Sequence, residues 1–238
     1  MCSGRVDPEF VLRAFSNGMD GVFIGGCRLN ECNYITHGNY HALNMVLLFK
    51  RIMEHVGLNP ERLRIEFMSS AEGIVFAEVM SDFGKKVREL GPLGNGEGLN
   101  EYELKAKLAE VAKLIPYIKV MENAKLGKHL LNPAEYDQFF TREEIDKLFS
   151  EAPSYYIDPE KCQACMICAR RCPAEAIISA KGQIHIVKQE ECIKCGTCFE
   201  VCPPKFGAVK KIVGAPVPPP LPEDRRSIVR KSKEKETV

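Results

Sequence analysis

The sequence predicts an α/β fold in its first part, with a parallel sheet and flanking helices, followed by a small cysteine-rich part. Three observations lead to this prediction. Residues 1–95 alternate helical and strand patterns, cysteines gather in two runs at 162–173 and 192–203, and a glycine-rich stretch at 91–98 marks a boundary. Helices that alternate with single strands favour a parallel sheet, because each helix returns the chain to the end where the previous strand began.

The first elements are a helix from residue 7, a short strand and a long helix. Asp7 has a side chain suited to capping the first helix. Residues 21–27, GVFIGGC, are a short apolar run and predict a buried strand. Apolar residues then recur at helical spacing from Met45 to Val56, and Gly57 ends that helix.

A second strand and a third helix follow in the same order. Residues 64–70, RIEFMSS, predict the strand, and Ser69 and Glu72 have the spacing of a capping box that opens the helix. The apolar face expected for this helix consists of Phe76, Met80, Phe83, Val87 and Leu90. A parallel α/β unit begins with a strand, and none precedes the helix at residue 7, so we expect the first strand to be missing.

The remaining segments are a connector and a tail. Residues 96–154 predict a helical connector that packs the two parts together, and Thr141 and Glu144 within it repeat the capping-box spacing. Residues 214–238 are rich in proline and then in basic side chains, which is typical of a disordered tail. The alternative for this tail is a clamp that lies along an acidic partner.

The two cysteine runs indicate the cofactor. Residues 162–173 read CQACMICARRCP and residues 192–203 read CIKCGTCFEVCP, each a Cys-x2-Cys-x2-Cys-x3-Cys-Pro pattern. In this pattern three thiolates hold one 4Fe–4S cluster, while the fourth crosses to the other cluster. The predicted ligands of the first cluster are Cys162, Cys165, Cys168 and Cys202. Those of the second cluster are Cys192, Cys195, Cys198 and Cys172.

Zinc is the alternative for these cysteines, and the spacing argues against it. Structural zinc sites need four ligands, commonly as two separated pairs, and do not require two identical runs that each end in proline. Between the runs, Lys181-Gly182 separates two short alternating stretches, which predicts a hairpin. Residues 155–213 therefore resemble the bacterial two-cluster ferredoxin module, an α+β two-cluster ferredoxin-like domain.

A second group of thiols lies in the first part. Cys27 and Cys32 follow the strand at 21–27, and Cys2 lies where a preceding strand would end. Since the carboxyl ends of parallel strands share one edge of a sheet, we expect these three thiols to converge, with the amides of Gly25 and Gly26 close to sulfur. They are either ligands of an iron–sulfur site or ordinary free cysteines, and three is one fewer than a 2Fe–2S cluster needs.

Residues 1–95 also resemble a known family. The stretches CSGRVDPE, GGCRLNECNY followed by GNY, and SSAEG resemble the delta subunit of methyl-viologen-reducing hydrogenase. The resemblance implies a 2Fe–2S cluster on Cys2, Cys27 and Cys32, with further ligands in an earlier segment that this chain lacks. It also implies that the chain is cut at its N-terminus, and that Asn30 stands where relatives often carry glycine.

The function that the resemblance implies is electron transfer. Such a protein passes electrons from a hydrogenase or formate dehydrogenase to a flavin-containing heterodisulfide reductase subunit. No nucleophile, acid–base pair or dinucleotide fingerprint is found, so we expect no catalytic site. The alternatives are a stand-alone oxidoreductase with an open cluster iron, which only the first thiol group offers, and a thiol redox sensor that uses Cys27 and Cys32.

The composition argues against several other classes of protein. The net charge of +1 argues against a nucleic-acid-binding protein, and no apolar run is long enough to span a membrane. The 11 cysteines are odd in number and clustered, which argues against the disulfide framework of an exported protein. We therefore expect a cytoplasmic protein.

Overall fold

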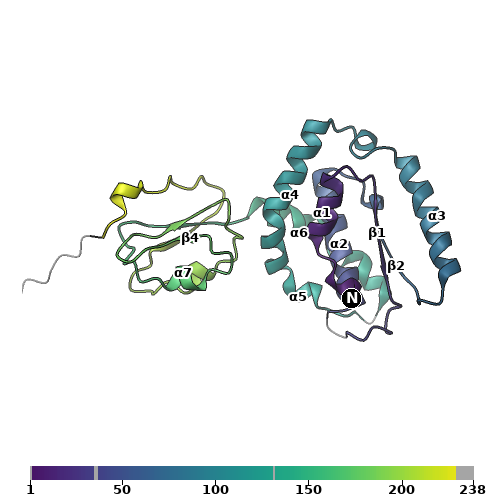
Figure 1. Ribbon diagram of the computed structural model, residues 1–238, viewed down its shortest axis with the longest axis horizontal. Coiled ribbons are helices and arrows are strands. Elements are labelled where there is room, and N and C mark those ends of the chain that lie inside the picture. The colour runs from purple at the N-terminus through teal and green to yellow at the C-terminus, as the bar shows by residue number, and fades with distance from the viewer. Residues whose placement is uncertain (1, 35–36, 131, 229–238) are drawn as a thin grey trace, which may run out of the picture. The chain divides into compact units, whose positions relative to one another are not determined.

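The computed structural model describes residues 2–34, 37–130 and 132–228 of the 238-residue chain. The chain divides into two compact units, residues 1–150 and 151–238 (Figure 1). Short 3-10 helices lie at Ser3–Arg5, Pro60–Arg62, Asn95–Glu97, Pro133–Gln138 and Glu223–Arg225.

The first unit contains the predicted helix–strand–helix–strand order. Helix α1 (Pro8–Ser16) begins where Asp7 accepts a hydrogen bond from the Glu9 amide, as the sequence predicts. Strands β1 (Val22–Gly26) and β2 (Leu63–Phe67) pair in parallel, with Val22 opposite Leu63 and Gly26 opposite Phe67. The described residues of this unit thus hold a two-stranded parallel sheet.

Helix α2 (Asn39–Val56) forms the centre of the core in the first unit. Its buried face includes Met45, Phe49, Ile52 and Met53, each at most 2% exposed. Gly57 ends the helix in the left-handed conformation, with φ of 84°. The predicted end of this helix at Gly57 is confirmed, and α2 begins at Asn39, before the predicted pattern from Met45 to Val56.

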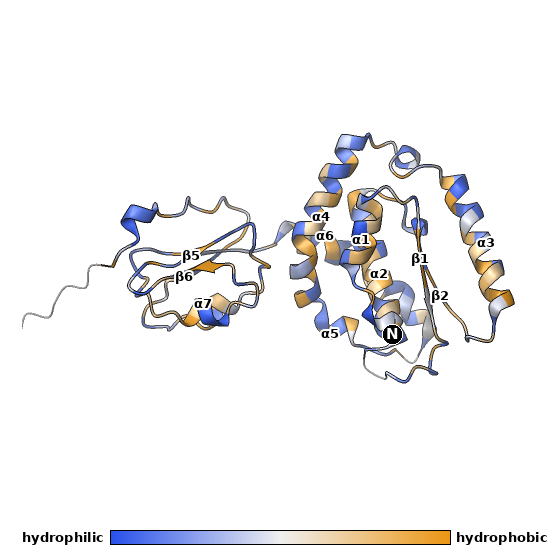
Figure 2. Cartoon of the chain, viewed as in Figure 1, coloured by the Kyte–Doolittle hydropathy of each residue, from blue (hydrophilic) through white to orange (hydrophobic). Residues whose placement is uncertain are grey.

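Helix α3 (Gly73–Leu90) differs from the prediction at its start and on its face. Ser69 and Glu72 form a turn before the helix instead of a capping box that opens it. The Glu72 carboxylate accepts a hydrogen bond from the Ser69 amide, while the Ser69 hydroxyl accepts one from the Ala71 amide. Of the expected apolar face only Phe83 is buried. Figure 2 shows apolar residues of α3 in orange. Phe76, which was expected on the buried face, is 48% exposed.

Residues 101–150 fold with the first unit. Helix α4 (Glu101–Met121) packs against α1, a short helix α5 (Asn123–Leu126) follows, and α6 (Arg142–Ser150) packs against α2. Thr141 caps α6 by accepting a hydrogen bond from the Glu144 amide, while the Glu144 carboxylate turns to Lys125. The predicted connector thus supplies two helices to the core of residues 1–150.

Buried charges hold the glycine-rich stretch to this unit. The Arg62 side chain is fully buried, and its guanidinium donates to both carboxylate oxygens of Glu97, over 2.6 and 3.1 Å. Arg62 also donates to the carbonyl oxygens of Asp20, Leu90 and Gly91. The stretch that the sequence analysis assigned to a boundary is therefore fixed between the start of β2 and the end of α3.

The second unit is built from short strands and two small helices. Strand β3 (Ser154–Ile157) pairs antiparallel with β6 (Val209–Ile212), and β4 (Ile177–Ile178) pairs antiparallel with β5 (Ile186–Val187). Helices α7 (Ile167–Arg171) and α8 (Thr197–Glu200) lie within the two cysteine runs. The predicted hairpin between the runs is confirmed by the β4–β5 pair.

The described part of the tail packs on the second unit. The Ile184 amide donates to the Arg226 carbonyl over 2.7 Å, and the Ile228 amide donates to the Gly182 carbonyl over 2.8 Å. A cavity of about 380 Å³ lies between this segment and β5, lined by Pro218 and Leu221 among others. Arg226 and Ile228 are thus hydrogen-bonded to the second unit, and residues 229–238 of the tail predicted to be disordered lie outside the described part of the chain.

Candidate metal centres

The two cysteine runs fold into loops of the same conformation. In the first run Ala164 and Met166 have φ of 50° and 64°, and at the matching places of the second run Lys194 and Gly196 have φ of 57° and 84°. Alternation of left-handed residues with ordinary ones turns successive backbone N–H groups toward one side, which makes a concave site for an anion. Both loops are therefore shaped for a negatively charged cluster.

The four thiols predicted for the second cluster surround one cavity. Cys192, Cys195 and Cys198 from the second run line it together with Cys172 from the first run. Burial, together with the charges of the neighbouring thiols, Cys192 foremost, raises the pKa of Cys198 to about 12. The structure thus brings together cysteines from both runs, as the crossing pattern predicts.

The thiols predicted for the first cluster are likewise neighbours. Burial raises the pKa of Cys168 to about 11, with added repulsion from Cys162, Cys165 and Cys202. These four residues are the predicted ligand set. Because Cys168, Cys192 and Cys198 have raised pKa values, their thiolate forms require positive charge nearby, which cluster irons would supply.

The donors of both predicted clusters are all cysteines, which are the ligands that 4Fe–4S clusters take. No group of three or more His, Cys, Asp or Glu side chains in the part of the chain that the structure describes is placed to hold one metal ion. The cysteine sulfurs around a cubane bind different irons. They therefore lie farther apart from one another than four sulfurs that each bind the same zinc ion at a Zn–S distance of about 2.3 Å. The ligands here are all cysteines, and Cys162, Cys168 and Cys198 belong to the buried core of this unit.

Two polar side chains that no sequence motif predicted contact the Sγ atoms of predicted cluster ligands. His185 Nδ1 lies 3.3 Å from Cys168 Sγ, and the Thr197 hydroxyl lies 3.3 Å from Cys195 Sγ. A sequence signal for His185 existed, because a histidine in an alternating apolar stretch at the core-facing register is unusual.

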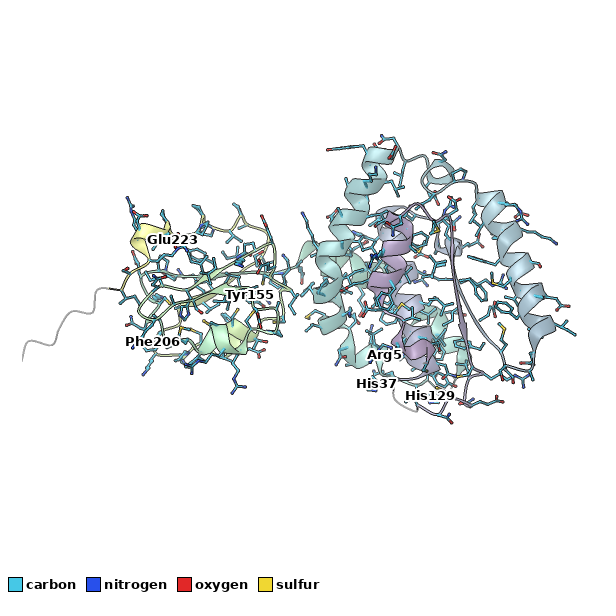
Figure 3. The ribbon with its side chains drawn as sticks, viewed as in Figure 1. Arg5, His37, His129, Tyr155, Phe206 and Glu223 are labelled. Carbon is cyan, nitrogen blue, oxygen red and sulfur yellow. The ribbon has the colours of Figure 1, made fainter. Side chains whose placement is uncertain are left out.

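The structure brings Cys2, Cys27 and Cys32 together at the carboxyl ends of the two strands. Cys2 Sγ lies 3.7 Å from Cys32 Sγ. Asn39 Nδ2 lies 3.7 Å from Cys27 Sγ and donates over 2.9 Å to the Cys27 carbonyl. The predicted convergence of these thiols is present, at the end of the unit where Figure 3 labels Arg5, His37 and His129.

The amides that reach these sulfurs come from other residues than predicted. The Gly4 amide donates to Cys2 Sγ over 3.4 Å and the Tyr34 amide to Cys32 Sγ over 3.5 Å, whereas no such bond is found from Gly25 or Gly26 among the described atoms. Asn30 has φ of 70°, a conformation that glycine adopts without strain and asparagine tolerates.

One glycine permits the loops around these thiols to close. A Cβ on Gly38 would lie 2.5 Å from Cys32 Sγ and would also collide with the Tyr34 carbonyl. The loops that follow β1 and β2 are joined by Arg28, whose Nε donates to Glu72 over 3.0 Å. The thiol group is thus held in a loop frame with no room for a larger residue at position 38.

The pKa values of Cys27 and Cys32 are shifted in opposite directions. Burial and the neighbouring Cys32 thiol raise the pKa of Cys27. Burial also acts to raise the pKa of Cys32, but hydrogen bonds from the Tyr34 and Asn39 amides outweigh it and the net shift is downward. Cys32 is therefore more readily ionised than Cys27, which favours it as a metal ligand or nucleophile.

Among the described residues, no helix combines the length and the apolar character that crossing a bilayer requires.

Comparisons with known proteins match the two parts separately. Residues 1–91 match the family described as methyl-viologen-reducing hydrogenase, delta subunit. Residues 154–203 match the family described as 4Fe-4S dicluster domain. The second match indicates iron–sulfur clusters in the second unit.

Three relatives illustrate the range of similar proteins. The iron–sulfur subunit of an F420-non-reducing hydrogenase from Archaeoglobus profundus is 50% identical over 91 residues, which are 38% of this chain and 66% of that protein. A component of the ferredoxin:CoB-CoM heterodisulfide reductase from Methanosarcina mazei is 46% identical over 113 residues, which are 48% of this chain and 14% of that protein.

The third is the vhu iron–sulfur subunit of an F420-non-reducing hydrogenase from Methanopyrus kandleri, 39% identical over 92 residues, which are 39% of this chain and 69% of that protein. The chain spans less than two thirds of the first two relatives.

Proposed function

Because the chain belongs to the family of methyl-viologen-reducing hydrogenase delta subunits, we propose that it is an iron–sulfur electron-transfer subunit. It passes electrons between a hydrogenase or formate dehydrogenase and a flavin-containing component of the heterodisulfide reductase type. The observation that carries the proposal is the grouping of Cys172 with Cys192, Cys195 and Cys198 around one cavity. Such crossing is the ligand arrangement of a two-cluster electron carrier.

The residues of the second unit would perform three tasks in this function. Cys162, Cys165, Cys168 and Cys202 hold one 4Fe–4S cluster, and Cys192, Cys195, Cys198 and Cys172 hold the other. When bound, the clusters accept and release single electrons. The left-handed loop residues aim amides at the clusters, and the buried surroundings keep water from the sulfurs.

The partners are inferred from the names of the relatives. One relative belongs to a hydrogenase and another to a heterodisulfide reductase, and each shares 46% or more identity with part of this chain. A stand-alone oxidoreductase is less favoured because it needs a cluster iron with a non-cysteine ligand, and each predicted 4Fe–4S set contains four cysteines.

For the first unit we propose a 2Fe–2S cluster that takes Cys2, Cys27 and Cys32 as three of its ligands. The convergence of the three sulfurs and the lowered pKa of Cys32 support it. A thiol redox sensor is the second candidate. The 3.7 Å approach of Cys2 Sγ to Cys32 Sγ makes that pair a candidate for a disulfide, beside the predicted pair of Cys27 and Cys32.

Reduction in the absence and presence of a partner tests the carrier function. The isolated, iron-loaded chain is expected to take up electrons from dithionite but to turn over no disulfide and no nicotinamide. Addition of the flavin-containing component of a heterodisulfide reductase is expected to reoxidise the chain, as followed by cluster absorbance. Turnover by the chain alone, or no electron transfer to the flavin, would contradict the proposal.

A further inference from the structure

His185 is a buried polar residue in contact with a predicted cluster ligand. It is 1% exposed and directly precedes β5, and its Nδ1 atom lies 3.3 Å from Cys168 Sγ. It is the one histidine in the sequence of residues 151–238. A contact of this length is short enough for a hydrogen bond to sulfur, so the imidazole and the thiol interact directly.

The chemistry of the sulfur fixes the direction of this hydrogen bond. A cysteine bound to iron is a thiolate and has no proton to donate, so Cys168 Sγ can only accept. Nδ1 of His185 must then carry a proton. Nε2 is buried and has no hydrogen-bond partner among the described atoms, which leaves the contact with Cys168 as the polar interaction assigned to the ring.

The internal repeat of the sequence gives this contact a counterpart. His185 precedes Cys192, the first cysteine of its run, by seven residues, and Tyr155 precedes Cys162 by the same distance. Tyr155 lines the cavity of the second predicted cluster, and His185 contacts a ligand of the first. The two halves of the unit therefore place different aromatic side chains against the two clusters.

We propose that His185 is a positioning residue that raises the reduction potential of the cluster held by Cys162, Cys165, Cys168 and Cys202, through an Nδ1–H hydrogen bond to the Cys168 sulfur. Reduction adds negative charge to the cluster and its ligand sulfurs. A donated hydrogen bond stabilises that charge more in the reduced than in the oxidised form. The proposal rests on the proposed function, because it presupposes the two clusters.

Two variants of His185 isolate the hydrogen bond from the packing. His185→Phe keeps a flat ring of similar size and removes the donor, whereas His185→Asn keeps an N–H near the position of Nδ1. Only the difference in hydrogen-bond strength between the reduced and oxidised forms shifts the potential, so we expect a change of at most about tenfold in the one-electron reduction equilibrium, or about 59 mV. We expect this downward shift in His185→Phe and a smaller one in His185→Asn.

The potentials are measured by redox titration of the full chain, with the hyperfine-shifted β-proton NMR signals of Cys168 and Cys195 reporting the two clusters separately. Thr197→Val is the matched control, because the Thr197 hydroxyl contacts Cys195 Sγ on the other cluster. We expect it to shift the second cluster and leave the first unchanged. Equal shifts of both clusters in His185→Phe, or no shift, would overturn the proposal.

A measurement on the unaltered protein covers the case in which His185→Phe fails to load iron. Pulsed EPR of the reduced chain, labelled with 15N at histidine, is expected to show nitrogen coupling to a cluster. The absence of coupling would overturn the role of His185. Iron content of about eight or more per chain in the same sample keeps the two 4Fe–4S clusters of the proposed function, so the two failures are distinguishable.

Discussion

Cys2 Sγ and Cys32 Sγ lie 3.7 Å apart although the two residues are 30 positions apart in the sequence. Cys32 lies in the loop that follows β1, and Cys2 immediately precedes the 3-10 helix Ser3–Arg5, which packs against β1 and α2. Gly38 leaves space for the Cys32 sulfur, and the Arg28–Glu72 pair joins the loops that follow β1 and β2.

The first prediction concerns the reactivity of these thiols in the iron-free protein. We expect iodoacetamide to modify Cys32 before Cys27, because the pKa of Cys32 is lowered and that of Cys27 is raised. Mild oxidation is expected to link Cys2 to Cys32. Peptide mass spectrometry measures the order of alkylation and identifies the disulfide. A dominant Cys27–Cys32 disulfide would contradict the expected Cys2–Cys32 link.

The second prediction concerns the space around Cys32. Gly38→Ala is expected to displace the Cys32 sulfur, because the added Cβ would lie 2.5 Å from it. The rate of Cys2–Cys32 disulfide formation should then fall by about tenfold or more, since the bond tolerates little change in geometry. Gly73→Ala is the control because no atom lies within 4 Å of its added Cβ. Equal rates in both variants would contradict the role of Gly38.

The third prediction concerns the crossing ligand. Cys172→Ser is expected to damage the cluster of Cys192, Cys195 and Cys198, since these residues line one cavity with Cys172. The cluster of its sequence neighbours should remain. The hyperfine-shifted NMR signals of Cys168 and Cys195 identify which cluster is lost. Loss of the Cys168 signals alone would show that each run binds its own cluster.

The fourth prediction concerns the buried ion pair of the first unit. Glu97→Gln leaves the Arg62 charge buried without its carboxylate and is expected to cost about 3 kcal/mol of unfolding free energy. Urea denaturation at neutral pH measures the loss. The control is Glu101→Gln, in an ion pair whose side chains are 82% and 69% exposed, where a change below about 1 kcal/mol is expected. Similar losses of unfolding free energy in the two variants would contradict the stabilisation assigned to the buried Arg62–Glu97 pair.

The same pair predicts a pH dependence. Burial acts to raise the pKa of Glu97, but hydrogen bonds from Arg62 and from the Asn59 and Gly94 amides outweigh it and lower the pKa. The stabilisation is therefore complete above the pKa of an unfolded glutamate, about 4.3, and is lost as the pH falls through the lower folded value. Denaturation midpoints of the wild type and Glu97→Gln should begin to converge as the pH falls below about 4.3. A constant difference between them would contradict this assignment.

Local sequence signals predicted much of this fold. Asp7 and Gly57 mark helix ends because side-chain capping and a left-handed glycine act within a few residues. The convergence of Cys2, Cys27 and Cys32 also followed from strand order, since parallel strands place their carboxyl ends together. The cysteine spacing likewise predicted which thiols would be neighbours in the second unit.

Features that depend on long-range contacts were not predicted. The Glu72 carboxylate bonds Arg28 and the Ser69 amide, so it closes a turn where the spacing alone suggested a helix start. The tail composition gave no sign of the pairing between Ile184 and Arg226. His185 carries no spacing motif, and its role became visible when β5 placed it beside Cys168.

The central claim is that the second unit holds two 4Fe–4S clusters, and iron content tests it most directly. The variant Cys2→Ser/Cys32→Ser removes any contribution from the first thiol group. Prepared anaerobically as the full chain, it is expected to bind about eight irons, with a Mössbauer spectrum of 4Fe–4S clusters alone. A content of about four irons per chain, or zinc in place of iron, would contradict the claim.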